Sequence, residues 1–504
     1  MRVLAASCAA IALIAGACAT TGPQEQTTLA PAPVVTLAPR TLNAEDSRTA
    51  TRLAETIDGY VRNRGFNGVV LVANADGVIV HQARGVSSLE LDSKLGPDDV
   101  FRIGSLTKPL TAVLVLTLVS EGRLRLDGSL GEYLPELYAN TPASGVTIEQ
   151  LLAHTSGLKD VPGNYFDPFW ATVARQTFTP EAFAKQWITP EIASPPGKWR
   201  YNNNGFYLLG LIVERVTKTP YADALQQKVL TPAGMTHSGV YDVATVVPHL
   251  ASGYARSDFG MMERPMFLNP TVSYAAAGAY SNADDLLAFS KALMSDRLLP
   301  ADLKARMFAD DGDQYGLGWG VESWATTQGA KAAVQTHTGS IPGYQSLFAR
   351  ADDGTIVVIL NNYWQGLTVA ELGRDLFAVA HDAPARTPKR LLGDLLTPIA
   401  ARGGVDAMEA AYRSSPIEGA DAYDVSESAL NSLGYTLLRK GYKESAVRVF
   451  EWNVANHPQS ANVHDSLGEA YLNIGRRDDA RRSYESALRL DPSSTSARAA
   501  LAGL

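Results

Sequence analysis

Two segments far apart in the chain each carry the pattern of an antiparallel hairpin, and this pair most constrains the fold. "FNGVVLVANADGVIVHQARG" (66–85) has strand-forming runs on both sides of an Asp-Gly turn, and "GYQSLFARADDGTIVVILNN" (343–362) repeats that design. Between them lie helical patterns, such as "SLTKPLTAVLVLTLVSEG" (105–122). We therefore expect one antiparallel sheet that the N- and C-terminal segments of a domain complete together, with helices packed on it.

A second helix is expected at "SNADDLLAFSKALMSD" (281–296), where Ser281 and Asp284 form a capping signal. The chain of 504 residues is too long for one ordinary domain, and its 46% of apolar residues supports a large core and excludes wholesale disorder. The 44 basic and 52 acidic residues form no basic run, which argues against nucleic acid as a partner.

The first residues have the pattern of a targeting signal. Arg2 precedes an apolar stretch that is too short to span a bilayer, so we expect a signal peptide over 1–18 and an exported protein of the periplasm or cell envelope. "LIAGAC" resembles a lipoprotein processing site, which would anchor the chain to a membrane through Cys18. The alternative is simple cleavage at the small residues 15–17.

Residues 19–45 are rich in Thr, Pro and Gln and have no period, which predicts a disordered tether. Cys8 and Cys18 both belong to the signal, so the mature chain has no disulfide, cysteine nucleophile or cysteine zinc site. The eight histidines are scattered without ligand spacing. We expect neither a metal nor another cofactor.

A first domain is expected over 46–382, and "DAPARTPKR" marks a linker that we place at 383–399. Beyond it, "SLGYTLLRKGYKESAVRVFEWNVANHP" matches "SLGEAYLNIGRRDDARRSYESALRLDP" at a constant shift of 34 residues. This resembles the tetratricopeptide repeat, with flanking helices completing a helical domain over 400–504. The repeats are either a packing module or a groove for a protein partner.

Ser105 and Lys108 stand three positions apart where an apolar helical run begins. That spacing puts both side chains on one helix face, near free backbone N–H groups that favour negative charge. Lys108 can accept a proton only when neutral, and lowering a lysine pKa from about 10.4 to about 7 costs roughly 4 to 5 kcal/mol, which burial can supply. The alternative, an ordinary surface charge, predicts an exposed Lys108.

Two later stretches complete a constellation. "PGKWRYNNNGFYLLG" contains Tyr201 and Asn203 in a YxN arrangement, and "THTGSIPGYQS" contains His337, Thr338 and Gly339 ahead of a strand. Together with SxxK, and in this order, the motifs resemble those of the serine beta-lactamase and penicillin-binding-protein superfamily, and most of all its class C and esterase-type branch.

The resemblance covers about residues 46–380 and includes the phrases "LLAHTSGL" (151–158) and "YGLGWGVE" (315–322). It implies an α/β (α+β) fold of the beta-lactamase type, in which helices flank an antiparallel sheet and form a helical subdomain. An all-α domain of the tetratricopeptide type would follow at the C-terminus.

The resemblance also implies roles in acyl transfer through a serine ester. Ser105 would be the nucleophile, Lys108 its proton acceptor, and Tyr201 the group that carries a proton to the leaving group. Asn203 would orient the acyl chain. The backbone N–H groups of Ser105 and Ser340 would form the oxyanion hole.

One position departs from the family pattern. His337 stands where beta-lactamases and cell-wall peptidases of this family usually carry lysine, and histidine is mostly neutral at pH 7. Losing a close cation weakens carboxylate recognition by about 1 to 3 kcal/mol. We therefore favour hydrolysis of esters or amides, including D-amino-acid peptides. The alternative in the same class is a beta-lactamase or D-alanyl-D-alanine carboxypeptidase.

Two further interpretations concern residues outside the three motifs. His154 could be a second base, but we interpret it as a hydrogen-bonded loop anchor. The aromatics of "DVPGNYFDPFWATVAR" (160–175) predict an apolar or sugar-contacting rim at the entrance. A hypothesis from another class is a non-catalytic envelope scaffold that acts through the repeats.

Overall fold

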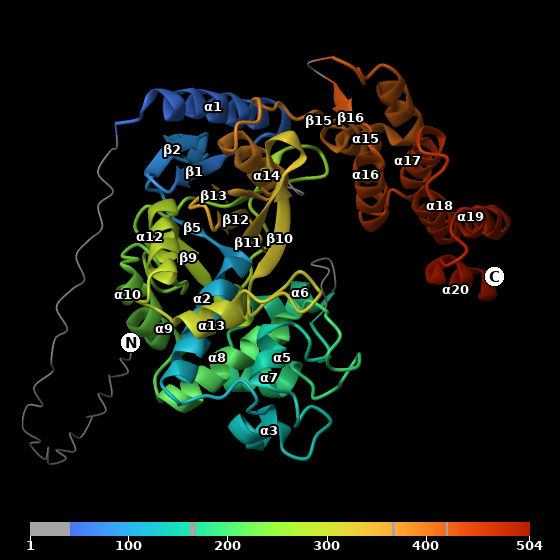
Figure 1. The fold of residues 1–504 in the computed structure, drawn as a ribbon. Coiled ribbons are helices and arrows are strands. Elements are labelled where there is room, and N and C mark those ends of the chain that lie inside the picture. Colours follow the sequence, from blue (N-terminus) through green and yellow to red (C-terminus); the bar gives the residue numbers. More distant parts are fainter. Residues whose placement is uncertain (1–40, 162–167, 365–367, 420–421) are drawn as a thin grey trace, which may run out of the picture.

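The computed structural model describes residues 41–161, 168–364, 368–419 and 422–504 (Figure 1). The predicted signal peptide, Cys18 and the tether up to residue 40 lie outside the described residues, as does the stretch 162–167 of the predicted rim. In the described part, no helix combines the length and the apolar character needed to cross a membrane.

A six-stranded antiparallel sheet forms the centre of the first domain. Its strands, in spatial order, are β10 (Gly320–Ala325), β11 (Lys331–Ile341), β12 (Tyr344–Ala351), β13 (Ile356–Asn361), β1 (Gly68–Asn74) and β2 (Gly77–Arg84). Both predicted hairpins are present, β1 with β2 and β12 with β13. They join where Val70 of β1 pairs with Ile359 of β13, so the two ends of the domain meet in the sheet as expected.

The sheet is covered on both faces. Successive side chains of β1 point to opposite faces of the sheet, and those on each face are buried in a core. Val70 and Val72 pack into one core, which is shared with helices α1 (Ala44–Arg64) and α14 (Thr368–Ala380). Val69 and Leu71 belong to the larger core on the other side. That larger core contains α2 (Thr107–Ser120), whose side chains are nearly all buried.

The remaining helices of the first domain contribute side chains to the same larger core as α2 and include the predicted helical subdomain (Figure 1). They are α3 (Leu130–Tyr133), α4 (Pro135–Tyr138), α5 (Ile148–Leu152), α6 (Pro168–Thr172), α7 (Pro180–Trp187), α8 (Asn203–Thr217), α9 (Tyr221–Leu225), α10 (Thr231–Ala233), α11 (Pro270–Ala277), α12 (Ala283–Met294) and α13 (Ala301–Met307). Short turns of other helix types are η1 (Gly104–Leu106), η2 (Val173–Arg175), η3 (Gln226–Leu230) and η4 (Thr327–Gly329).

Short strands tie the loops together in small sheets. They pair β3 (Val86–Ser88) with β4 (Ser93–Lys94), β9 (Ala279–Ser281) with β5 (Phe101–Arg102) and β6 (Gly239–Val240), β7 (Tyr254–Arg256) with β8 (Met262–Glu263) and β14 (Tyr363–Trp364), and β15 (Arg390–Leu391) with β16 (Tyr423–Asp424).

The predicted cap of helix α12 is wrong by one residue. The cap is Asn282, whose side chain accepts a hydrogen bond from the backbone N–H of Asp285 at 2.9 Å. Ser281 instead ends strand β9, and its hydroxyl lies 2.8 Å from that of Ser238. The short strand therefore takes the residue that the capping pattern favoured.

The C-terminal region consists of stacked helices, as the repeat predicted (Figure 1). They are α15 (Leu392–Arg413), α16 (Glu427–Arg439), α17 (Lys443–Asn456), α18 (Ala461–Asn473), α19 (Arg477–Leu490) and α20 (Thr495–Ala502). Both repeats bring a glycine against an aromatic ring: a Cβ at Gly434 would lie 2.5 Å from Phe450, and one at Gly468 would lie 2.8 Å from Tyr484. The expected flanking helices are α15 and α20.

The segment expected as a linker, 383–399, contains regular structure. Strand β15 and the start of α15 lie in it, because Leu392 and Leu396 are buried in the core of the helical region. The helical region therefore begins before residue 400, while the other domain limits stay predictions. Arg256 of the first domain is 2.6 Å from Asp394, so the two regions touch through an ion pair.

Candidate active site

Ser105 lies in the η1 turn that leads into α2, between the helical core and the sheet. The preceding Gly104 has a φ of 53°, and a Cβ there would lie 2.8 Å from the backbone nitrogen of Ser340. Only glycine fits this approach. A hydrogen bond of 2.7 Å from Ser346 Oγ to the carbonyl oxygen of Ile103 also ties the turn to the sheet. Ser105 and the main chain of Ser340 are thus held next to each other.

Lys108 is fully buried, so the alternative of a surface charge is wrong. Its Nζ lies 3.1 Å from Ser105 Oγ. It also donates to the side-chain oxygen of Asn203 and to the carbonyl oxygen of Ala276, each at 2.9 Å. Burial lowers the pKa of Lys108 from 10.5 to about 7, although the negative charge of Asp160 opposes that shift. Near pH 7 a large fraction of the protein molecules therefore carries a neutral Lys108 amine.

A kink in helix α11 positions the carbonyl oxygen of Ala276, to which Lys108 donates. Tyr274 has a φ of 36°, a left-handed conformation that is strained for a tyrosine. After the kink, the carbonyl oxygen of Ala275 accepts from Thr111 Oγ1 at 2.8 Å, and that of Ala276 accepts from Lys108. The strained turn thus directs backbone oxygens at α2.

Asp160 orients the Asn203 side chain, whose oxygen accepts from Lys108. The sequence analysis did not identify Asp160 as a site residue. Its carboxylate accepts from the backbone N–H of Asn203 at 3.0 Å, from the Asn203 side-chain amide at 3.2 Å, and from the backbone N–H of Asn204 at 3.1 Å. The amide of Asn203 is therefore oriented with its nitrogen toward Asp160 and its oxygen toward Lys108. Asp160 follows "LLAHTSGLK" directly, but an acidic residue in a loop carries no sequence signal for a contact more than forty positions away.

Tyr201 comes from the loop before α8, and its ring lies beside the amine. Lys108 Nζ is 4.8 Å from the ring centroid of Tyr201. The centroid of the Tyr201 ring is also 4.3 Å from that of the His154 ring and 6.3 Å from that of the His337 ring. The structure thus brings Ser105, Lys108, Tyr201 and Asn203 together around one nitrogen atom.

The third motif forms the end of strand β11, just before the turn into β12. Side chains alternate along it: His337 and Gly339 are buried, whereas Thr338 and Ser340 are exposed. His337 Nδ1 donates to the carbonyl oxygen of Thr338 at 2.6 Å, so Nε2 accepts from the Tyr315 hydroxyl at 3.0 Å. Burial, together with the nearby Lys108 cation, lowers the pKa of His337 to about 3. His337 is therefore neutral.

Tyr315 is a further site residue that the motifs did not reveal. It lies within "YGLGWGVE", where the sequence offered only a resemblance, and its ring packs 4.9 Å from that of His154. Burial raises the pKa of its hydroxyl well above 10. It therefore stays protonated and donates to His337. We call Tyr201, Tyr315 and His337 the polar wall of the site.

His154 is placed as the loop anchor we expected. Its Nδ1 accepts from the backbone N–H of Asn202 at 3.2 Å, and its carbonyl oxygen accepts from the backbone N–H of Arg200 at 2.8 Å. Burial lowers its pKa well below 6.5, so the ring is neutral. It packs against the Tyr201 ring, with the two centroids 4.3 Å apart.

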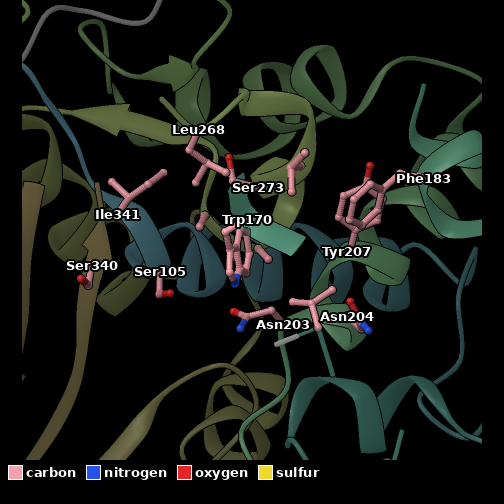
Figure 2. A pocket seen from close by; sticks show the side chains of 14 residues that line it. Ser105, Trp170, Phe183, Asn203, Asn204, Tyr207, Leu268, Ser273, Ser340 and Ile341 are labelled. Atoms are coloured by element: carbon pink, nitrogen blue, oxygen red, sulfur yellow. The ribbon is translucent and has the colours of Figure 1, made fainter. Parts of the chain in front are cut away.

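A cavity opens from Ser105 (Figure 2), and Tyr201 is not among the residues that line it. Ser105 and Ser340 lie at one end, Phe183 and Tyr207 at the other, and Trp170 between them. The cavity, counted with its open mouth, holds about 640 Å³. Trp170 confirms an aromatic contribution from the predicted rim segment, as far as that segment is described.

Among the described residues, one group of side chains away from the site has the right types for a metal ion. The ligand atoms of His81, Asp98 and Asp284 lie within 4.8 Å of one another. His81 contacts Asp284 at 3.6 Å through Nδ1 and the carbonyl oxygen of Pro97 at 3.1 Å through Nε2. These contacts satisfy the ring without an ion, so we assign no metal there.

The fold and the site together define a class of protein. A central antiparallel sheet beside a helical region, with a serine and a buried lysine at their junction, is the arrangement of the penicillin-recognising serine enzymes. The beta-lactamase family model matches residues 53–381, and the tetratricopeptide repeat model matches residues 461–494. The chain belongs to the beta-lactamase family and is a serine hydrolase.

The proteins that this chain resembles include an esterase, an amidohydrolase and a penicillin-binding protein. The chain is 27% identical over 375 residues to the esterase EstB of Burkholderia gladioli, covering 66% of this chain and 95% of the esterase. The structure resembles a D-stereospecific amidohydrolase from Streptomyces sp. (26% identity, TM-score 0.54, covering 64% and 98% of the two chains). It also resembles a penicillin-binding protein from Bacillus halodurans (25% identity, TM-score 0.55, 65% and 98%).

Proposed function

We propose that this protein is an exported hydrolase of esters or amides that works through an acyl-enzyme on Ser105. The observation that carries the proposal is the placement of Lys108, which is buried, has a pKa of about 7, and is 3.1 Å from Ser105 Oγ. A neutral amine has two N–H bonds and one lone pair. The oxygens of Asn203 and Ala276 accept the two N–H bonds, which leaves the lone pair for the Ser105 hydroxyl.

The reaction then follows from the positions of these groups. Ser105 Oγ attacks the carbonyl carbon of the substrate, and its proton moves to Lys108 Nζ. Negative charge develops on the carbonyl oxygen, where the backbone N–H groups of Ser105 and Ser340 stabilise it. Tyr201, beside Lys108, gives its hydroxyl proton to the departing alcohol or amine and takes up the proton that Lys108 received from Ser105. Water attacks the acyl-serine in the second half, with proton transfers in the reverse direction.

The substrate class follows from the polar wall. His337 is neutral and already bonded to Thr338 and Tyr315, so it offers no permanent cation to a substrate carboxylate. An esterase and a D-stereospecific amidohydrolase among the relatives support esters and amides, including D-amino-acid peptides. Efficient beta-lactam hydrolysis or carboxypeptidase activity is the weaker alternative, because both need a carboxylate site.

Two parts of the proposal concern the chain outside the catalytic domain. The N-terminal sequence supports export to the periplasm or envelope, with Cys18 as the point of lipid attachment. The repeat model at residues 461–494 supports a protein partner for the helical region. The intact mass of the mature protein from cells tests the first part, because a lipidated chain begins at Cys18 and carries acyl groups.

Active-site labelling tests the catalytic proposal. After exposure to an activated ester, the wild-type protein should gain the mass of one acyl group, and Ser105→Ala should gain none and lose turnover at least about 10³-fold. Ser340→Ala is the matched control, because it removes a nearby hydroxyl but keeps the backbone N–H. Equal turnover in wild type and Ser105→Ala would overturn the proposal and leave a scaffold acting through the repeats.

A further inference from the structure

The cavity beside Ser105 has an apolar wall, formed by Trp170, Phe183, Tyr207, Leu268, Val272 and Ile341. Each of these side chains is at least nine-tenths buried. They come from α6, α7, α8, α11, the loop before α11 and the end of β11, so the wall is built from many elements. The rings of Phe183 and Tyr207 pack with centroids 4.6 Å apart and close the inner end.

The polar groups that reach this wall already have partners. The Tyr207 hydroxyl donates to the carbonyl oxygen of Thr271 at 2.9 Å, and Ser273 Oγ donates to that of Pro270 at 3.0 Å. The Asn204 amide donates to the carbonyl oxygen of Lys159 at 2.9 Å. The described residues that line the cavity include no Lys, Arg, His, Asp or Glu. A charged group placed there would lose its hydration without gaining a counter-ion.

The position of the cavity decides which half of the substrate enters it. Tyr201, Tyr315 and His337 do not line it, whereas Ser105, Asn203 and Ser340 do. In the proposed mechanism the leaving group takes its proton from Tyr201, which lies outside the cavity. The acyl group is therefore the half of the substrate that is left to enter the cavity, which begins at Ser105 and Asn203.

We infer that the apolar wall is an acyl-binding site that selects uncharged acyl groups with an aromatic or branched apolar side chain. This inference rests on the proposed function, since it assigns the acyl half of the substrate of the same serine. Trp170 is the specificity-determining residue, because its ring lies between the nucleophile and the inner end of the cavity. Small acyl groups are accepted but leave the apolar surface uncovered.

A series of p-nitrophenyl esters with one leaving group and different acyl groups tests the inference. We expect kcat/KM for a 3-phenylpropionyl ester to exceed that for the acetyl ester by about tenfold to a hundredfold, as is usual for filling an apolar pocket. A succinyl ester, with its free carboxylate, should be turned over no better than the acetyl ester. Equal kcat/KM across the series, or a preference for the succinyl ester, would overturn the inference.

The variant Trp170→Ala shows whether the preference comes from this wall. It should lose most of the 3-phenylpropionyl preference, so that the ratio of its kcat/KM values for the 3-phenylpropionyl and acetyl esters falls toward one. Changing the leaving group at constant acyl group should affect wild type and Trp170→Ala alike. A Trp170→Ala protein that keeps the full preference would contradict the assignment.

The two proposals fail in different ways. If no ester acylates Ser105, the proposed function fails. If all esters acylate Ser105 at the same rate, the proposed function is supported and the acyl-binding site is rejected. Because the ester series needs only the wild-type protein, the inference can be tested even if Trp170→Ala does not fold.

Discussion

In the polar wall, a hydrogen bond links Tyr315 and His337, whereas the apolar wall presents carbon atoms to the cavity beside Ser105. On the polar wall, Tyr315 donates to His337, and His337 donates to the Thr338 carbonyl oxygen. On the apolar wall, the hydroxyl of Tyr207 is turned to the backbone of Thr271. The side chains of the apolar wall are at least nine-tenths buried, whereas Tyr201 and Tyr315 of the polar wall are partly exposed. Only the polar wall contains a group to which we assign proton transfer.

We expect the polar wall to determine the rate of proton transfer and the apolar wall to determine which acyl group is bound. Lys108 is fully buried, and burial lowers its pKa to about 7. A cation on either side would repel its proton further and change the pH at which it works. Changes on the polar wall should therefore alter rate and pH dependence, and changes on the apolar wall should alter the choice of acyl group. Three substitutions on the polar side test this division.

The largest effect is expected from Tyr201→Phe, which keeps the ring against Lys108 and His154 but removes the hydroxyl. Loss of the proton carrier should lower kcat by about 10²- to 10⁴-fold, with the same acyl preference as the wild type. Stopped assays with the ester series measure both quantities. Tyr315→Phe is the matched control, since it removes a hydroxyl bonded to His337, and its kcat should fall less than about tenfold. A Tyr201→Phe enzyme with wild-type kcat would remove Tyr201 from the mechanism.

The pH profile is the readout for Asp160→Asn. In the wild type, kcat/KM should fall below an inflection near pH 7, because Lys108 must be neutral and its pKa is about 7. The negative charge of Asp160 raises that pKa, so its removal should move the inflection to lower pH. Misplacement of the Asn203 amide should also lower the plateau, by up to about 10²-fold.

Asp160 also caps the start of α8 through backbone N–H groups, so thermal unfolding must be measured with the profile. A merely structural role would lower stability and the plateau but leave the inflection in place. Lys159→Ala, which breaks an exposed ion pair with Glu191, is the neighbouring control and should leave the profile unchanged.

The smallest effect is expected from His337→Lys, which adds a cation to the polar wall. Acylation by a fluorescent penicillin, which carries a carboxylate, should become about tenfold faster. His337→Gln keeps the wall neutral and should show no gain. An equal gain in both variants would mean that removal of the imidazole, and not the added charge, is responsible.

Local patterns in the sequence were enough for much of the fold. The hairpins could be predicted because their alternation and turns are properties of about twenty neighbouring residues, and the repeat because Gly434 and Gly468 recur in one register. The cap of α12 could not, since whether Ser281 caps the helix or ends β9 depends on the strand that pairs with it. The start of the helical region was misplaced because "DAPARTPKR" has the composition of a linker, while the burial of Leu392 depends on distant helices.

The site divides in the same way. Ser105, Lys108, Tyr201, Asn203 and the residues of the third motif were expected from their motifs. The structure brings the first four together at the Lys108 amine, and His337 of the third motif lies beside the Tyr201 ring. Asp160 and Tyr315 were missed, because their significance lies in contacts with Asn203 and His337 that no local pattern records. The roles of the predicted residues remain to be tested by the substitutions above.

The sequence by itself determined that a serine and a lysine stand three positions apart where an apolar helix begins, because helical geometry brings residues with that spacing to one face. Only the tertiary structure decided that the lysine is buried, with a pKa lowered to about 7, and that its amine lies 3.1 Å from the serine hydroxyl. Those properties need the oxygens of Asn203 and Ala276, which lie 95 and 168 positions away along the chain, and a core that keeps water out. The acyl-binding wall is of the same kind, because its six side chains meet only once the sheet and the helices have packed.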